Sequence, residues 1–270
     1  MAAFLQATQN SSVGSQTSLV ATFGKKTLDG STLVVVTRQD VLLQTPSVTD
    51  DQGNVYTIAK VTTGAAYGCK LWYCLKAKAG VQQVTASFSG GDVGLQVFAA
   101  EYFGPSAVDQ SAEGGLVACP SGVDAVVTPS WTAAQTNNLI VAFINHATGA
   151  GSYGTTAAGT GFFKRLEADC GGAFSNLILC DNAGTPSSAG AGQKATWTQT
   201  VAFPAAFRFA IAFKDGTKHP NTPGQPTTSD QLGTWSVTQG IVGASLNDQP
   251  TYDQWTFLDG TVRKDWQSAS

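Results

Sequence analysis

Apolar and polar residues alternate with a period of two along most of this chain, and this pattern limits the possible fold more than any other feature. The clearest stretch is residues 205–213, where one face carries Phe207, Phe209, Ile211 and Phe213. A period of two is that of a β-strand with one buried face. Because the period of two is stronger than the helical period throughout the chain, the sequence predicts an all-β protein.

Residues 71–75 (LWYCL) form the most apolar strand of the first half, and turns separate it from its neighbours. A turn rich in Asp, Gly and Asn at residues 49–54 leads into the strand before it. Residues 32–37 form a continuous apolar and β-branched run, which is typical of a strand buried on both faces. These strands together predict a two-sheet antiparallel sandwich of the jelly-roll type.

The second half of the chain resembles the first in layout. A constant offset aligns several strand residues of like character, namely Leu33 with Leu139, Tyr56 with Phe162, Leu71 with Leu177, and Cys74 with Cys180. Two explanations stay open at this point. Either the sandwich consists of two quasi-repeated halves, or two amphipathic β segments align through composition alone.

The composition predicts four segments. Residues 1–17 are polar and form an N-terminal arm or a short strand, and residues 18–214 form the β-sandwich domain. Residues 215–229 contain three prolines and two glycines, which is the composition of a linker. Residues 230–270 are too few to bury a core of their own, so we expect a small β appendage there.

The C-terminal segment is rich in aromatic residues, which seek a partner surface when they occur in a short segment. A hairpin is predicted around the Asp259-Gly260 turn. The segment either packs on its own sandwich or serves as an anchoring and oligomerisation element. Its candidate assembly-interface residues are Trp235, Tyr252, Trp255, Phe257 and Trp266.

Charge and hydropathy exclude several classes of function. Charged residues make up only 12% of the chain, about half of the ~25% of an average soluble domain. The net charge is −3 and no long basic run occurs, which argues against nucleic-acid binding. No apolar stretch approaches the ~20 residues of a membrane-spanning helix. The N-terminus lacks the segments of a signal peptide, so we expect either a protein that is not exported through one or a leader already removed.

The five cysteines do not suggest a complete disulfide framework, because their number is odd. Cys170 and Cys180 flank a Gly-Gly pair and are close enough in sequence to meet across a hairpin. The alternative is that the cysteines are small buried apolar residues, and the sequence favours it.

A search for catalytic chemistry gives little. A glycoside hydrolase needs two facing carboxylates. The only pairing that can be suggested is Glu101 with Glu167 or Asp169, and it is a weak candidate. Only His146 and His219 are available as a histidine base, and both are expected on the surface. No nucleophile elbow, zinc spacing or nucleotide fingerprint occurs. We therefore expect no enzymatic activity and no cofactor.

The acidic turn is the one weak candidate for a metal. Asp50, Asp51 and Asn54 supply the oxygen atoms that Ca²⁺ prefers, but without the spacing of an EF-hand. A turn held together by its own Asp and Asn side chains explains the same residues.

Several of these stretches, taken together, resemble a known kind of module. They are residues 32–36, 48–57, 71–73, 84–90 and 100–102, and the likeness covers roughly residues 18–215. The chain is similar there to β-sandwich modules that recur in bacterial exported and surface proteins and in proteins of tailed bacteriophages. The resemblance implies a non-enzymatic binding or scaffold module.

The leading hypothesis is a structural component of a bacteriophage virion: a capsid decoration, head-fibre or tail-associated protein. Its expected partners are other virion proteins, such as the major capsid or tail protein, and further copies of itself. The alternative is a carbohydrate-binding or host-adhesion module, extracellular or on a cell surface, that binds glycans. Its candidate binding residues are Tyr67, Trp72, Tyr73 and Tyr153.

Overall fold

The computed structural model describes residues 2–39, 46–62, 68–92, 94–146, 156–169, 176–185 and 187–216, and the backbone of short strands at residues 235–236, 252–256 and 262–266. The chain forms two compact units, Met1–Asp215 and Gly216–Ser270. Every regular element in these described ranges is a β-strand. The predicted all-β class is therefore confirmed.

The first half of unit 1 is an eight-stranded sandwich. Its strands are β1 (Ala3–Ser12), β2 (Gln16–Thr22), β3 (Ser31–Gln39), β4 (Ser47–Asp50), β5 (Thr57–Val61), β6 (Gly68–Ala77), β7 (Gln83–Asp92) and β8 (Leu95–Phe103). The larger sheet has the order β1-β8-β3-β6-β5 and the smaller the order β2-β7-β4. The nested pairs β1 with β8, β2 with β7 and β3 with β6 are those of a jelly roll.

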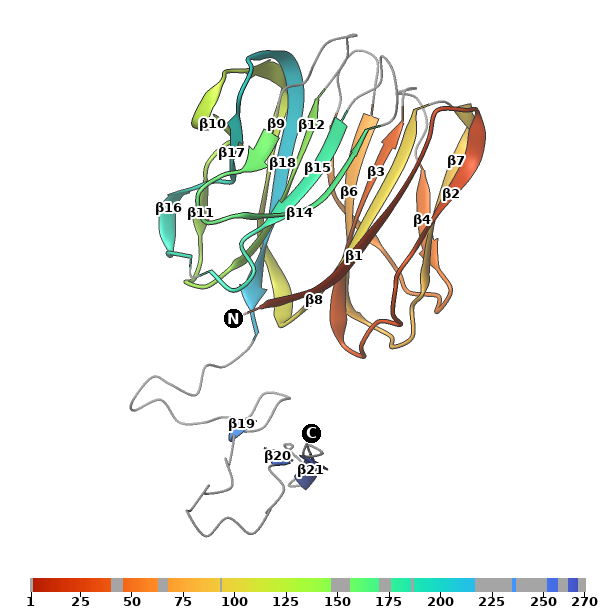
Figure 1. Cartoon of the computed structure of the whole chain (residues 1–270), viewed down its shortest axis with the longest axis vertical. Coiled ribbons are helices and arrows are strands. Elements are labelled where there is room, and N and C mark those ends of the chain that lie inside the picture. Colours follow the sequence, from red (N-terminus) through yellow and green to blue (C-terminus); the bar gives the residue numbers. More distant parts are fainter. Residues whose placement is uncertain are drawn as a thin grey trace. The chain divides into compact units, whose positions relative to one another are not determined.

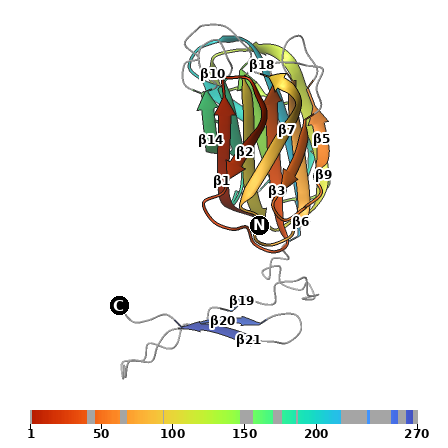
Figure 2. The same cartoon turned by 90° about the vertical axis from the view of Figure 1, so that its right-hand side faces the viewer.

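The second half contains ten strands. They are β9 (Pro105–Cys119), β10 (Gly122–Val127), β11 (Trp131–Ala133), β12 (Leu139–His146), β13 (Thr156–Ala158), β14 (Phe163–Asp169), β15 (Asn176–Asp181), β16 (Gly190–Gln193), β17 (Thr196–Gln199) and β18 (Phe203–Asp215). Its sheets have the orders β14-β15-β12-β18-β9, β10-β17-β13 and β11-β16. The whole of unit 1 is drawn in Figures 1 and 2.

The two halves have the same topology. When β1 is matched with β9, β3 with β12, β5 with β14, β6 with β15 and β8 with β18, both larger sheets have one strand order, and so do the three-stranded sheets. Even a bulge recurs, between Ile58 and Lys60 in β5 and between Lys164 and Leu166 in β14. Chance alignment through composition does not produce a shared strand order and a shared bulge, so the quasi-repeated layout is real.

The constant sequence offset is nevertheless wrong for the central strand. Leu33 packs in the core inside the first half, whereas Leu139 packs between the halves. Val36 and Phe143 are the matching positions, because each lies between a leucine on one neighbouring strand and a phenylalanine on the other. A slip of one residue exchanges the two faces of a strand, which explains the mismatch.

Unit 1 is a stack of four layers (Figure 1). One apolar core lies within the first half and a second within the second half, while a third joins the two five-stranded sheets face to face. All nine residues of β3 are buried because Val34 and Val36 face the other half and Leu33 and Val35 face inward. This double burial accounts for the continuous apolar run in the sequence.

The contact between the halves has an approximate two-fold character. β1 of the first half contacts β14 of the second, and β9 of the second half contacts β5 of the first. These two contacts are equivalent under the strand correspondence, as in an isologous dimer interface. Unit 1 is thus built like a dimer whose two subunits are joined in one chain.

Two stretches that look irregular in sequence are strands. The expected N-terminal arm contains β1, which pairs with β8 along its length. Its Thr8 hydroxyl donates to the Thr22 carbonyl at 2.8 Å, and the Asn10 amide donates to the Val20 carbonyl at 2.9 Å. Residues 104–122, which contain Gly, Pro and Ser and show little alternation, contain the long strand β9. β9 is an edge strand with several register shifts against β18, so its alternation is weak.

The described cysteines are buried apolar residues, as the sequence favoured. Cys69, Cys74, Cys119 and Cys180 are buried, and each carries a thiol and not a disulfide sulfur. Burial raises the pKa of the Cys180 thiol to about 12, which keeps it protonated and unreactive. The disulfide suggested by the positions of Cys170 and Cys180 involves a residue outside the described ranges, Cys170; Cys180 itself is a free thiol.

Unit 2 contains a small antiparallel sheet of β19 (Trp235–Ser236), β20 (Tyr252–Thr256) and β21 (Val262–Trp266). β20 and β21 form the predicted hairpin. Trp235 pairs with Trp255, and Tyr252 pairs with Trp266. Aromatic residues therefore occupy facing register positions in both strand pairs.

A substitution at Gly159 tests the packing between β13 and β17. A Cβ atom at Gly159 would lie 2.6 Å from the carbonyl carbon of Thr196 and would overlap the Asp124 carboxylate as well. We expect Gly159→Ala to lower the free energy of unfolding by about 1–3 kcal/mol, measured by urea denaturation. Gly24→Ala is the matched control, because nothing lies within 4 Å of its Cβ position. Equal stability of the two variants would contradict this packing.

Candidate functional site

The two described aromatic residues among those predicted to bind carbohydrate, Trp72 and Tyr73, pack against different cores. Trp72 is buried in the core of the first half, and its indole N–H donates to the Thr37 hydroxyl at 3.1 Å. It is therefore not available to stack on a sugar. Tyr73 is half-buried between the halves, edge-on to Phe213 at 6.0 Å between ring centroids. Tyr67 and Tyr153 lie outside the described residues.

The acidic turn before β5 is held together by its own side chains. One oxygen of Asp50 accepts hydrogen bonds from the backbone N–H groups of Gln52 and Asn54, at 2.9 and 3.1 Å. The other accepts from the Asn54 amide at 2.8 Å and the Tyr56 hydroxyl at 2.9 Å. Asp51 accepts from the backbone of Gln82. The geometry is that of a braced turn.

Electrostatics in this turn agree with the hydrogen bonds. Burial alone would raise the pKa of Asp50, but the hydrogen bonds from Asn54, Tyr56 and Gln52 outweigh it and hold the pKa below its usual value. Burial, with the negative charge of Asp50, raises the pKa of Tyr56 far above its ordinary range. Among the described residues, no three His, Cys, Asp or Glu side chains come together as a metal site would require.

The two glutamates of the hydrolase hypothesis lie far apart. The amide of Gln96 on β8 donates to the carbonyl of Ala168 at 2.9 Å, so Glu167 lies level with Gln96. Glu101 lies five residues farther along β8, an offset of about 16 Å along the strand at ~3.3 Å per residue, so the two glutamates do not occupy facing positions. Paired glycosidase carboxylates lie within ~10 Å of each other. The side chain of Asp169 is outside the described residues.

Glu167 is also poorly suited to act as a general acid. Its carboxylate accepts hydrogen bonds from Lys164 at 2.5 Å and from the Asn176 amide at 2.7 Å. Burial alone would raise its pKa, but these contacts hold the pKa below its usual value. A catalytic acid needs the opposite shift.

His146 is not on the surface as expected. It is the last residue of β12 and is fully buried. Its Nε2 atom lies 3.5 Å from the Thr156 hydroxyl, and burial lowers the pKa of its imidazole. The sequence interpretation was wrong because it placed His146 in the following Gly-rich loop region and not in the central strand of a sheet buried on both faces. His219 lies outside the described residues.

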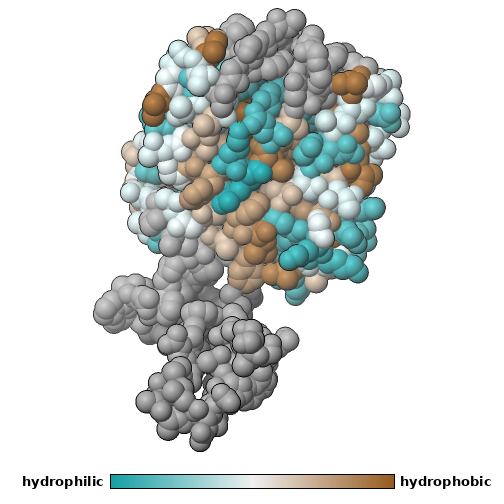
Figure 3. Space-filling view, in the orientation of Figure 1, coloured by the Kyte–Doolittle hydropathy of each residue, from teal (hydrophilic) through white to brown (hydrophobic). Residues whose placement is uncertain are grey.

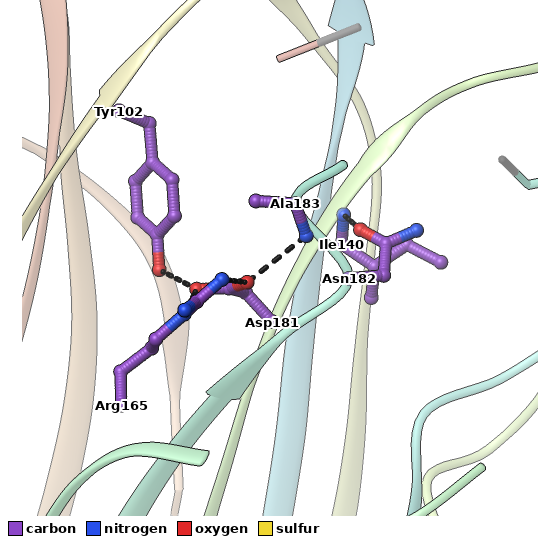
Figure 4. Close-up of polar contacts among 6 residues, drawn as sticks. All are labelled: Tyr102, Ile140, Arg165, Asp181, Asn182 and Ala183. Carbon is purple, nitrogen blue, oxygen red and sulfur yellow. Dashed lines mark hydrogen bonds and ion pairs between the residues drawn. The ribbon is translucent and has the colours of Figure 1, made fainter. Parts of the chain in front are cut away.

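The most concentrated polar site links the two halves (Figure 4). Asp181, at the end of β15, is fully buried. Its carboxylate accepts two hydrogen bonds from Arg165, at 2.8 and 2.9 Å, and one from the Tyr102 hydroxyl at 2.9 Å. The backbone N–H of Ala183 completes the set at 2.9 Å. Tyr102 belongs to the first half and the other residues to the second, so this cluster joins them.

Arg165 extends the same link through its guanidinium. The guanidinium carbon lies 4.2 Å from the ring centroid of Phe4 on β1 and 5.1 Å from that of Phe163. Burial alone would lower the pKa of Arg165, but the hydrogen bonds to Asp181 outweigh it and raise the pKa. Burial, together with the charge of Asp181, raises the pKa of Tyr102. The cluster is therefore an ion pair with a neutral tyrosine, held inside an apolar interface.

Sequence reasoning did not find this cluster. The signal available was Asp181 itself, a charged residue directly after the apolar run of β15. A charge in that place needs a partner. Its partner Tyr102 is 79 residues away in the other half, so no local pattern could name it.

The face of unit 1 that Figure 3 shows carries both hydrophilic and hydrophobic residues. The exposed large apolar residues of β1 and β14 are Leu5 and Phe163, at 38% and 47% exposure. Lys164 and Glu167 form an exposed ion pair on β14. Within the described part of the chain there is no helix that is long and apolar enough to span a membrane.

Comparisons with known proteins leave the family of the chain open. A scan against protein-family models gave no match, and searches of curated proteins and of solved structures gave no significant match. Function must therefore be argued from this chain's own residues.

Removing Asp181 tests whether the polar cluster joins the halves. Asp181→Ala would leave the Arg165 guanidinium and the Tyr102 hydroxyl without their acceptor, so we expect it to lower the free energy of unfolding by about 3–5 kcal/mol. Tyr102→Phe is the matched control, because it removes one hydrogen bond and should cost about 1 kcal/mol. The measurement is urea denaturation followed by tryptophan fluorescence. A loss for Asp181→Ala no larger than that of Tyr102→Phe would contradict the assignment.

Proposed function

We propose that this protein is a structural component of a bacteriophage virion: a capsid decoration, head-fibre or tail-associated protein. Jelly rolls occur in viral capsid proteins and in lectins, but a fold does not by itself imply a function. The support must come from what the two units of this chain are able to do.

Unit 1 has the character of a rigid body. Its large apolar residues pack into three cores that span all four layers. Asp50 is engaged in a turn, Asp181 in the link between the halves and His146 in the sheet interior. Such a body suits a scaffold that keeps its shape while it is attached to something else.

Unit 2 carries the observation on which the proposal chiefly rests. Tyr252 and Trp266 occupy one pair of facing register positions, and Trp235 and Trp255 occupy another. A sheet of three short strands is too small to bury so many aromatic residues within itself. Partners such as a capsid or tail protein, or further copies of the chain, would cover them.

Particle incorporation tests the proposal. Particles of the phage or prophage whose genome carries the gene are purified, and the protein is sought by mass spectrometry and immunogold labelling. We expect it at a fixed copy number on the particles. Its absence from particles, with all of it soluble in the lysate, would contradict the proposal.

The attachment role of unit 2 is tested on the same particles. In the full chain, the double substitution Trp255→Ala with Trp266→Ala should reduce incorporation at least tenfold, because it removes one aromatic residue from each of the two register pairs. Gln254→Ala, at a neighbouring position of β20, is the control and should leave incorporation unchanged. The thermal unfolding of unit 1 should be the same in all three proteins.

A further inference from the structure

An open cleft lies at one end of the first half, apart from the link between the halves. It has a volume of about 480 Å³ and is lined by Leu5, Gln6, Ala7, Gly24, Lys25, Lys26, Leu28 and Glu101. The lining comes from β1, from β8 and from the connection between β2 and β3. The volume is within the range of pockets that hold small ligands, ~300–1,000 Å³.

The cleft is built around a β-bulge. The register of β1 against β8 shifts between Phe4 and Gln6, which places Gln6 opposite Glu101. The amide of Gln6 then fixes the connection, donating to the Lys25 carbonyl at 2.9 Å and accepting from the Lys25 N–H at 3.1 Å. Bulges commonly re-aim side chains next to binding sites. Here the bulge leaves Leu5 exposed on the rim of the cleft.

Glu101 lies at the base of the cleft and is only 1% exposed. One carboxylate oxygen accepts a hydrogen bond from the Leu28 N–H, and the other accepts from the Gln6 amide, both at 2.7 Å. No lysine or arginine among the described residues forms an ion pair with it. Each carboxylate oxygen can accept a further hydrogen bond. Both hydrogen-bond donors are uncharged, so the carboxylate keeps its negative charge without a cationic partner in contact with it.

The second half shows that the fold does not require this carboxylate. Strand pairing places Ala212 of β18 where β8 has Glu101. The connection that corresponds to residues 23–30 contains β11 there, which pairs with β16 and buries Trp131 and Ala133. The same end of the second sandwich is therefore occupied by protein. The open cleft and its glutamate therefore occur in the first half and not in the second. A feature that the repeated fold does not require is a candidate for a specific binding site.

We propose that this cleft binds a saccharide unit of a glycan. Sugar hydroxyls would accept from the ammonium groups of Lys25 and Lys26, and one would donate to Glu101 where this residue lines the cleft, while Leu5 and Leu28 contact the apolar face of the sugar ring. A cationic ligand fits less well, because the cleft already carries two lysines for one carboxylate. A neutral ligand with many hydroxyl groups matches this combination of acceptor, donors and apolar walls.

The test is binding of a panel of mono- and disaccharides to the full chain, including glucose, galactose, N-acetylglucosamine and rhamnose, by ligand-observed NMR and calorimetry. We expect millimolar or tighter binding of at least one sugar. Glu101→Gln should weaken it about tenfold or more, because a hydrogen bond to a charged acceptor is lost. Leu28→Ser removes an apolar side chain from the cleft wall, and the backbone N–H of residue 28 can still donate to Glu101. Because Leu28 is half-exposed, the variant should fold, and its affinity for the sugar should be lower.

Val55→Ser is the matched control, since Val55 is an exposed valine that does not line the cleft. Its sugar affinity should equal that of the unchanged protein. The proposal is overturned if no sugar binds, or if Leu28→Ser and Val55→Ser have equal affinity. Binding of N-acetyl-lysine amide in place of the sugars would also overturn it, because the cleft would then be a site for a partner's cationic side chain. Incorporation into particles is measured separately, so this test is independent of the proposed virion role.

Discussion

The apolar contact between the two five-stranded sheets is the interaction on which unit 1 depends. It buries Val34, Val36 and Leu71 of the first half against Val141, Phe143 and other large residues of the second. Each larger sheet is consequently apolar on both faces. Neither half could keep this face in water, since exposed apolar patches of that kind lead to association. The halves are therefore two jelly rolls by topology but a single body by packing.

Polar groups make this contact specific. The Asp181 carboxylate with Arg165 and Tyr102 fixes one part of the interface, and the Gln96 bond to the Ala168 carbonyl fixes another. Apolar sheet faces alone would allow sliding, because the hydrophobic effect has no direction. A buried ion pair adds little net stability, but breaking it is costly. Its value here is that it selects one register between the sheets.

Departures from the internal symmetry carry the functional proposals. The repeat accounts for the larger sheets, the three-stranded sheets and the shared bulge. It does not account for the cleft at Glu101, which is open in the first half, or for unit 2, which has no counterpart in the repeat. The virion proposal rests on unit 2 and the saccharide proposal on the cleft, so the two stand on separate observations.

The sequence predicted the class of fold and the hairpin of unit 2, because alternation and turn residues are local signals. The long edge strand β9 was missed, since a half-exposed strand with several register shifts has weak alternation. His146 was misplaced because burial on both faces of a central sheet depends on a second half that no local pattern shows. Trp72 looked like a candidate for sugar binding. Pairing of its strand with β3 decides which face of the strand is buried, and Trp72 lies on that face. The cleft arises from a bulge in β1, and no feature of the sequence of β1 predicts that bulge.

Calorimetric unfolding of the full chain tests most directly whether the two halves form one body. If the sheet-to-sheet contact holds them together, unit 1 unfolds in a single transition whose calorimetric and van't Hoff enthalpies agree, and Asp181→Ala shifts that whole transition to lower temperature. Two separate transitions assignable to the two halves, with only one of them moved by Asp181→Ala, would contradict it.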